Sequence, residues 1–169
     1  MEAQLRPSGH SFRASKPLPH IGAGFTLVEL MLAIAILAVL VAIAVPSYQS
    51  YSERIKVQRA ESDIILMSAA IDLYERDNQE YPNNLAVTGN AGMLDPWGRP
   101  YQYLRLVPLD GAASGLRRKD RNLVPINSDY DLYSTGKDGD SRAPLTVPVS
   151  RDDIIRANNG RFVGLASDY

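Results

Sequence analysis

The stretch Gly24-Phe25-Thr26-Leu27-Val28-Glu29-Leu30 opens an apolar run that decides the fold of this chain. Between Phe25 and Val45 only Thr26 and Glu29 are not apolar. A run of about 20 such residues is long enough for a helix to cross the hydrocarbon core of a bilayer. A lone carboxylate inside a membrane helix is costly unless it finds a partner. The run therefore predicts a membrane helix in which Glu29 is a candidate functional residue.

The segment before this run is basic, because it carries Arg6, Arg13 and Lys16 against the single acid Glu2. A basic segment beside a membrane helix stays in the cytoplasm, so the rest of the chain is expected on the other side of the membrane. A secretory signal peptide would have a shorter apolar region followed by a small-residue cleavage site. Composition alone leaves open an uncleaved signal anchor in which Glu29 is incidental.

Gly24, Phe25 and Glu29, followed by the apolar run, resemble the amino-terminal signature of type IV pilins and of the pseudopilins of type II secretion. The resemblance implies that residues 1–24 are a leader removed by a prepilin peptidase, and that the new amino-terminal Phe25 is N-methylated. It also implies that residues 25–45 form a transmembrane and assembly helix, with Phe25 and Glu29 as assembly positions.

Pro46 stands where the resembled family commonly has a proline, and it counts as a third assembly position. Residues 46–77 are expected to continue the helix as an amphipathic half. Apolar residues recur there at spacings of three and four, as on one face of a helix: Val57, Ala60, Ile64, Met67, Ile71 and Tyr74. Pro46 removes one internal hydrogen bond, so we expect a kink or local melting, or else two separate helices broken at that point.

The remaining residues, 78–169, are predicted to form a globular β-rich domain. Residues 101–106 alternate in polarity like a strand, and residues 130–134 read as another strand. Trp97 lies in a turn with two prolines and is expected to anchor that turn on the core, rather than to bind a ligand. The fold class is therefore α+β, with a long amino-terminal helix packed on a small antiparallel sheet domain with long loops, as in type IV pilins.

Three further motifs resemble the major pseudopilin of type II secretion: Tyr81-Pro82, Asp95-Pro96-Trp97-Gly98-x-Pro100-Tyr101-x-Tyr103 and Asp131-Leu132-Tyr133-Ser134-x-Gly136-x-Asp138-Gly139. Together with the amino terminus, the resemblance extends from residue 24 to about residue 140. Ordinary pilins share only the amino-terminal part of this pattern. The motifs of the globular part therefore favour a secretion pseudopilin.

The loops of the globular part have no covalent support, because the chain contains no cysteine. Many type IV pilins close their carboxyl-terminal region with a disulfide, so something else must hold these loops. Residues 109–122 also depart from the family pattern. They contain the basic cluster Arg117-Arg118-Lys119, which is expected in an exposed loop that is either solvated or in contact with an anion.

Oxygen-bearing side chains gather in the turn over residues 136–141 and again at Asp152 and Asp153. Two adjacent acids can cap the start of a helix, or they can bind a hard cation such as calcium, which takes about six to eight oxygens. The resemblance to the major pseudopilin implies calcium. Carried over to this chain, the side-chain ligands are Asp138, Asp152 and Asp153, and loop carbonyls around Ser134 and Lys137 complete the shell.

Composition argues against two classes of function. The chain has no cysteine and its only histidines, His10 and His20, precede Gly24, so no nucleophile has a base beside it and an enzyme is not expected. The formal net charge of −1 gives no basic field for nucleic acid.

The resemblance implies a structural subunit of a periplasmic pseudopilus of type II secretion, assembled from the inner membrane to drive protein export. The chain would be a single-pass inner-membrane protein with its carboxyl-terminal domain in the periplasm. Its expected partners are copies of itself in a helical filament, the prepilin peptidase, the minor pseudopilins, the assembly platform and the membrane. Within the filament, Glu29 would pair with the Phe25 amine of a neighbour. The alternatives are a type IV pilus subunit for adhesion or DNA uptake, and a monomeric membrane-anchored periplasmic binding module.

Overall fold

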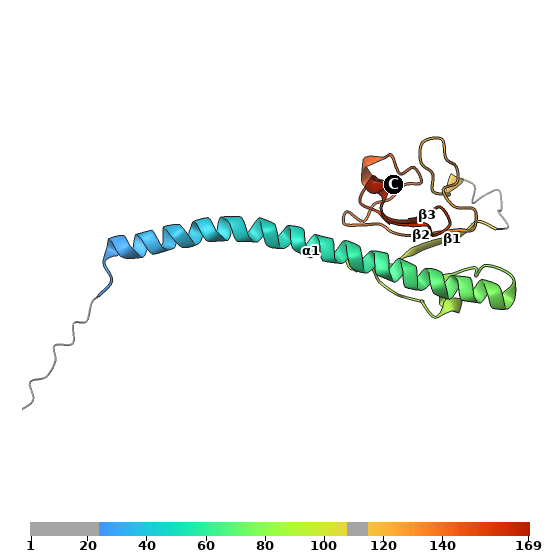
Figure 1. The fold of residues 1–169 in the computed structure, drawn as a ribbon, viewed down its shortest axis with the longest axis horizontal. Helices are drawn as coiled ribbons and strands as arrows, with labels where there is room; N and C mark the ends of the chain where they lie inside the picture. The colour runs from blue at the N-terminus through green and yellow to red at the C-terminus, as the bar shows by residue number, and fades with distance from the viewer. Residues whose placement is uncertain (1–23, 108–114) are drawn as a thin grey trace, which may run out of the picture. The chain divides into compact units, whose positions relative to one another are not determined.

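The computed structural model describes residues 24–107 and 115–169 (Figure 1). The chain divides between Ile43 and Ala44 into two compact units, and each unit is described by itself. The elements in chain order are α1 (Leu27–Asn78), η1 (Leu85–Thr88), β1 (Gln102–Arg105), β2 (Tyr130–Ser134), η3 (Pro148–Ser150), β3 (Ile154–Ala157), β4 (Phe162–Leu165) and η4 (Ala166–Asp168). The leader before Gly24 and part of the 109–122 loop lie outside the described residues.

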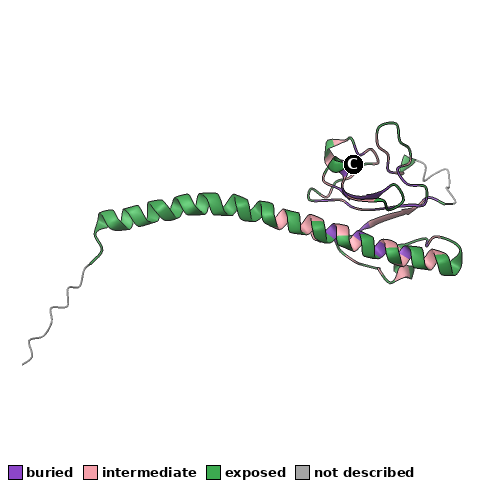
Figure 2. Ribbon diagram, viewed as in Figure 1, coloured by how far each residue is buried: buried purple, intermediate pink, exposed green. Residues whose placement is uncertain are grey.

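The helix α1 is assigned without a break, with Pro46 inside it, so the prediction of one helix is confirmed over the prediction of two. The hydroxyl of Ser50 donates to the carbonyl oxygen of Pro46 at 3.1 Å, one turn back. In the first unit, every described residue from Gly24 to Ile43 is exposed (Figure 2). The helix α1 is long and apolar enough to cross a membrane.

The second unit contains a four-stranded antiparallel sheet in the order β1-β2-β3-β4. The predicted strands are both present, although β1 is shorter than the stretch over residues 101–106. Gln102 pairs with Tyr133 at one end of the β1–β2 ladder, and Ile155 pairs with both Tyr133 and Gly164 on its two sides. The prediction of an α+β fold with a small antiparallel sheet is confirmed.

The part of α1 in the second unit buries one face against this sheet. The buried core residues are Ala60, Ile64, Met67, Ile71, Tyr101, Tyr130, Leu132 and Ile154. The four helical members are the centre of the apolar stripe predicted from the sequence, while Val57 is partly buried against it. Full burial of an aliphatic side chain stabilises a fold by about 1.5–3 kcal/mol. This stripe is therefore the main apolar contact of helix and sheet.

Aromatic groups also donate hydrogen bonds to acids of α1. Trp97 Nε1 donates to Glu53 at 3.2 Å, and the hydroxyl groups of Tyr101 and Tyr130 donate to Asp63 and Asp72 at 2.9 and 3.3 Å. Burial raises the pKa of both tyrosines well above the ordinary range, so these hydroxyls stay protonated donors.

Trp97 anchors its turn as expected, because the ring also packs against the buried core. The turn is held from its other side by Asp95, whose carboxylate accepts from the backbone amides of Trp97 and Arg99 at 3.0 and 2.8 Å. Asp95 is buried, and it accepts a further bond from the Ser134 hydroxyl of β2 at 2.5 Å. The turn is therefore joined both to the helix and to the sheet.

Candidate functional site

The start of α1 is closed by a capping box formed by Thr26 and Glu29. The amide of Glu29 donates to Thr26 Oγ1 at 3.2 Å, and the amide of Thr26 donates to Glu29 Oε2 at 3.5 Å. This reciprocal pattern satisfies amides that the first helical turn leaves without partners. A carboxylate at this end also interacts favourably with the helix dipole. Glu29 therefore has a local role in addition to the intersubunit role expected of it.

The two residues before the capping box are open to solvent. Phe25 is 83% exposed, and a Cβ added to Gly24 would meet nothing within 4 Å. The fold thus places no steric demand on Gly24. A requirement for glycine at this position would have to come from whatever binds the chain there.

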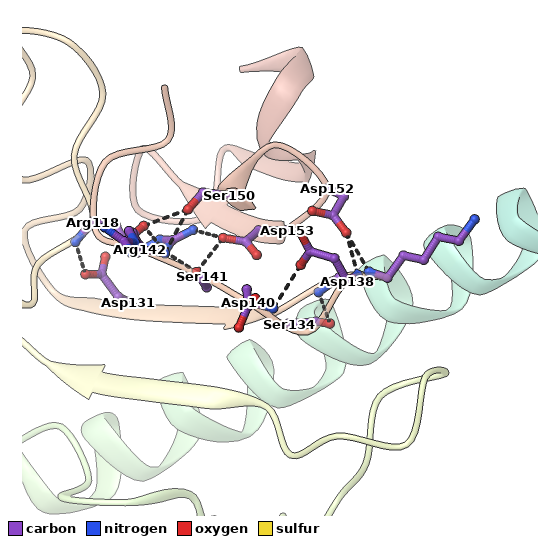
Figure 3. A network of polar contacts seen from close by, with 12 residues as sticks. Arg118, Asp131, Ser134, Asp138, Asp140, Ser141, Arg142, Ser150, Asp152 and Asp153 are labelled. Carbon is purple, nitrogen blue, oxygen red and sulfur yellow. Dashed lines mark hydrogen bonds and ion pairs between the residues drawn. The ribbon is translucent and has the colours of Figure 1, made fainter. Parts of the chain in front are cut away.

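The predicted cation ligands in the second unit form two groups, because Asp152 and Asp153 point in different directions. Both aspartates stand in the short segment just before β3, where residues 151 and 152 form a bend. Asp152 lies over the glycine turn that follows β2, and its Oδ2 accepts from the amides of Lys137 and Asp138 at 2.7 and 2.9 Å (Figure 3). Asp138 in turn accepts from the amide of Asp140 at 2.9 Å.

Gly136 is required in this turn by its close approach to Asp152. It has a positive φ of 63°, and an added Cβ would lie 2.1 Å from the carbonyl oxygen of Asp152. Its amide donates to the Ser134 hydroxyl at 3.1 Å, while its carbonyl accepts from the guanidinium of Arg99. The glycine turn and the segment before β3 therefore pack so closely that a side chain at position 136 would clash with Asp152.

Asp153 is fully buried, and its carboxylate faces the guanidinium of Arg118. Its Oδ2 forms an ion pair with Arg118 and accepts from the Ser141 hydroxyl at 2.6 Å (Figure 3). Burial raises the pKa of Asp153 to about 6, and Arg118 and Ser141 oppose that rise. The strand β3 begins at Ile154, so the alternative that Asp152 and Asp153 cap a helix is wrong.

Arg118 is the residue of this site that sequence reasoning missed. The expectation of an exposed loop is wrong for Arg118, which is only 2% exposed. Its guanidinium also donates to Ser141 and to the Arg142 carbonyl at 2.6 and 2.7 Å, and it lies 4.2 Å from the centre of the Tyr133 ring. A run of basic residues gave no sign of this, because solvated loops have the same composition.

The donor set at this site fits a hard cation in its chemistry. Calcium takes carboxylate and carbonyl oxygens, and the second oxygen of Asp153, Oδ1, is buried without a hydrogen-bond partner. Within residues 24–107 and 115–169, however, no three acidic or histidine side chains form a group that could hold a metal. The oxygens are of the right kind, but the side chains do not form a ready cage.

Other loops of this cysteine-free domain are also held by arginine. Arg156 forms a two-pronged ion pair with Asp129, at 2.9 Å from Nη1 to Oδ1 and 2.7 Å from Nη2 to Oδ2. Its guanidinium lies 3.9 Å from the centre of the Tyr130 ring. Both charged side chains are largely buried. Arg118 and Arg156 therefore hold loop segments through buried ion pairs, and Arg99 joins its turn to the turn at Gly136.

Comparison with known proteins places these features in a family. Residues 22–45 match the family described as the prokaryotic N-terminal methylation motif. The type II secretion system core protein G of Klebsiella pneumoniae is 35% identical over 141 residues, covering 78% of this chain and 91% of the relative. The same protein of Pseudomonas aeruginosa is 36% identical over 138 residues, covering 69% of this chain and 84% of the relative.

A fimbrial protein of Neisseria meningitidis is 29% identical over 140 residues, covering 80% of this chain and 79% of the relative. No solved structure gives a significant match. The matched methylation motif coincides with Gly24, the capping box and the apolar part of α1, while the core protein G relatives match across most of the chain. The chain therefore belongs to the family of the type II secretion system core protein G.

Proposed function

We propose that this chain is a structural subunit of a type II secretion pseudopilus, a helical filament that assembles from the inner membrane into the periplasm and drives protein export. Its partners are further copies of itself, the prepilin peptidase, the minor pseudopilins and the assembly platform. In this role the chain is not an enzyme and binds no nucleic acid. The family membership supports the proposal, because its curated relatives carry the name of a secretion-system core protein.

The observation that carries the proposal is the exposed apolar surface that follows the methylation motif. Every described residue from Gly24 to Ile43 is exposed in the monomer, including large side chains such as Leu37 and Leu40, which are both 59% exposed. Apolar surface of this extent in one region marks a membrane or protein contact. A filament subunit uses both contacts in turn, with lipid before assembly and with other subunits after it.

Glu29 and the new amino terminus would set the axial position of each subunit. Cleavage after Gly24 turns the uncharged amide of Phe25 into a charged amine. An unpaired charge in a low-dielectric environment costs several kcal/mol, so an amine and a carboxylate that meet there strongly favour one register. Among the described residues, the Glu29 carboxylate accepts a 3.5 Å bond from the Thr26 amide, and a charged donor would be a stronger partner than this neutral one.

Reconstitution of assembly tests the proposal. The full chain is expressed with a prepilin peptidase and a type II assembly platform, and sheared filaments are examined by electron microscopy and intact mass. We expect filaments built from a chain that begins at methylated Phe25, and none when the peptidase is omitted. A processed chain that stays monomeric beside a working assembly platform would contradict the proposal and favour a membrane-anchored binding module.

A type IV pilus subunit is the second candidate, because the fimbrial relative covers a similar share of the chain. Deleting the gene for this chain should have different effects for a secretion pseudopilus and for a type IV pilus. Loss of exported protein with surface pili intact supports the pseudopilus. Loss of surface pili, adhesion or DNA uptake with export intact would assign the chain to a pilus.

We also propose that calcium binds the acidic loop through Asp138, Asp152 and Asp153, with loop carbonyls around Ser134 and Lys137. The buried and unpartnered Oδ1 of Asp153 supports this reading. A ligand that binds only the folded state stabilises it by about 2.7 kcal/mol at a hundredfold excess over its dissociation constant. EGTA is therefore expected to lower the melting temperature of the full chain in detergent, with restoration by calcium but only poorly by magnesium. An unchanged melting temperature would contradict calcium binding.

A further inference from the structure

The guanidinium of Arg118 already occupies one side of the acidic loop. It is paired with Oδ2 of Asp153, and it shares Ser141 with that carboxylate, since Ser141 Oγ lies 2.6 Å from both groups. The side chains of Arg118 and Asp153 are 2% and 0% exposed. An arginine has a permanent charge and a planar fork of donors, so it serves as a fixed counter-ion in such a site.

The position of Arg118 is fixed by its backbone as well as by its side chain. Its amide donates to Asp131 Oδ2 at 2.8 Å, and its carbonyl accepts from the amide of Ile126 at 3.1 Å. The next residue, Lys119, exchanges backbone bonds with Ala143 and Leu145 at 3.0 and 2.9 Å. The guanidinium is therefore held in place by the sheet and by the loop that follows the acidic turn.

A cation that approached Oδ1 of Asp153 would meet this guanidinium on the other oxygen of the same carboxylate. Like charges that share one buried carboxylate repel each other, and the repulsion is little screened away from solvent. Arg118 and a bound cation thus compete for the negative charge of Asp153. Without either of them, Asp153 would be a buried charge with no counter-ion, which is strongly destabilising.

We propose that Arg118 is a built-in counter-ion that keeps the acidic loop folded without a bound cation and weakens the binding of calcium there. Asp152 and Asp138 are not paired with Arg118; instead, Asp152 accepts from the amides of Lys137 and Asp138, and Asp138 accepts from the amide of Asp140. The subunit therefore retains its folded domain when calcium is scarce. The part of this inference that concerns calcium rests on the cation site proposed above, whereas the counter-ion role of Arg118 does not.

The test uses the full chain in detergent, with unfolding followed by the fluorescence of Trp97, the only tryptophan. The variants are Arg118→Met, Arg118→Lys and the matched control Arg161→Met, which removes an exposed arginine of the same unit. In EGTA, we expect Arg118→Met to melt about 10 °C lower than wild type, Arg118→Lys to lie between them, and Arg161→Met to match wild type. Equal melting of Arg118→Met and wild type would overturn the proposal.

Calcium titration separates the two parts of the inference. We expect calcium to restore more of the melting temperature in Arg118→Met than in wild type, with half of the response at a calcium concentration at least about tenfold lower. The same midpoint in both proteins would overturn the competition between Arg118 and calcium. No response in either protein would instead reject the proposed calcium site and, with it, the claim of competition.

The counter-ion role is then decided by a double-mutant cycle. Removing both charges in Arg118→Met/Asp153→Asn should cost less than the sum of the two single changes, because neither charge is left alone. If Arg118→Met alone fails to fold, a double variant that does fold supports the counter-ion role, and a double variant that also fails to fold contradicts it. Additive losses in melting temperature would show that Arg118 and Asp153 act independently, and the proposal would fall.

Discussion

The amino-terminal unit and the globular unit of this chain differ in how far their side chains are buried and in where their hydrogen-bond partners lie. From Gly24 to Ile43 every described side chain is exposed, and the polar contacts of Glu29 are with Thr26, three residues away. Further along the same helix, Ala60, Ile64, Met67 and Ile71 are buried, and Glu53 and Asp63 accept hydrogen bonds from distant aromatic residues. The first unit therefore leaves its apolar side chains exposed in the monomer, whereas the second unit has a buried core of its own.

This difference shows which apolar surface remains to be buried when subunits assemble. The apolar surface before Ala44 gains its burial energy only from lipid or from other subunits, at about 25 cal/mol per Å². The globular unit has already gained that energy within the chain, and it has paired buried charges such as Asp129 and Arg156. Changes in the first unit should therefore affect processing and assembly, while changes in the second should affect folding.

The largest expected effect is the complete loss of processing in Gly24→Asp. A Cβ added at Gly24 meets none of the described residues within 4 Å, so the variant should insert and fold normally and fail only at the peptidase. Intact-mass analysis of membrane extracts should show residues 1–24 still attached in the variant and absent from wild type. Normal cleavage of the variant would mean that the peptidase does not read Gly24.

A buried and a surface ion pair of the globular unit should differ widely in cost. Asp129→Ala leaves Arg156 buried without its counter-ion and should destabilise the domain by about 3–5 kcal/mol. Glu80 is 56% exposed, and its carboxylate lies 3.4 Å from the guanidinium of Arg105. Glu80→Ala removes this surface pair and should cost less than about 1 kcal/mol. Urea unfolding of the full chain in detergent measures both. Similar costs would contradict the claim that the buried Arg156–Asp129 pair stabilises the domain.

Two neighbouring residues of α1 sharpen the contrast between its buried and exposed faces. Met67→Ala should cost about 2–5 kcal/mol, because Met67 is fully buried against the sheet. Leu66→Ala should change the unfolding free energy by less than about 0.5 kcal/mol, because Leu66 is 66% exposed. The same urea experiment applies, and a large loss from Leu66→Ala would mean that this face is covered in the monomer.

The most local effect is expected of Thr26→Val, which removes the hydroxyl of the capping box. It should weaken the first turn of α1 by about 1 kcal/mol and leave the melting temperature of the globular unit unchanged. Hydrogen exchange should be faster at the amides of residues 28–30 only. Unchanged exchange at these amides would show that the capping box does not stabilise the helix start.

The helix, its core face and two of the four strands were predictable from sequence because their signals are local. The spacing of Ala60, Ile64, Met67 and Ile71 defines one helical face, and residues 130–134 carry the pattern of a strand. These patterns repeat within a few residues, so they need no knowledge of distant partners.

The burial of Arg118 was not predictable in this way. Its partner Asp153 lies 35 positions further along the chain, and the sign of a charge does not say whether it is solvated. The division of Asp152 and Asp153 between two environments depends on the start of β3, which the sequence pattern did not reveal. Buried charges are decided by tertiary pairing, and one sequence shows only the charges.

Photocross-linking from the exposed face of the first unit tests the central claim most directly. A photoreactive benzoylphenylalanine replaces Leu40 in the full chain, in cells with the prepilin peptidase and the assembly platform, with or without Glu29→Val. We predict a ladder of homo-oligomers that Glu29→Val abolishes, while membrane insertion and the stability of the globular unit stay unchanged. A chain that cross-links only to lipid, or a ladder that survives Glu29→Val unaltered, would contradict this account of assembly.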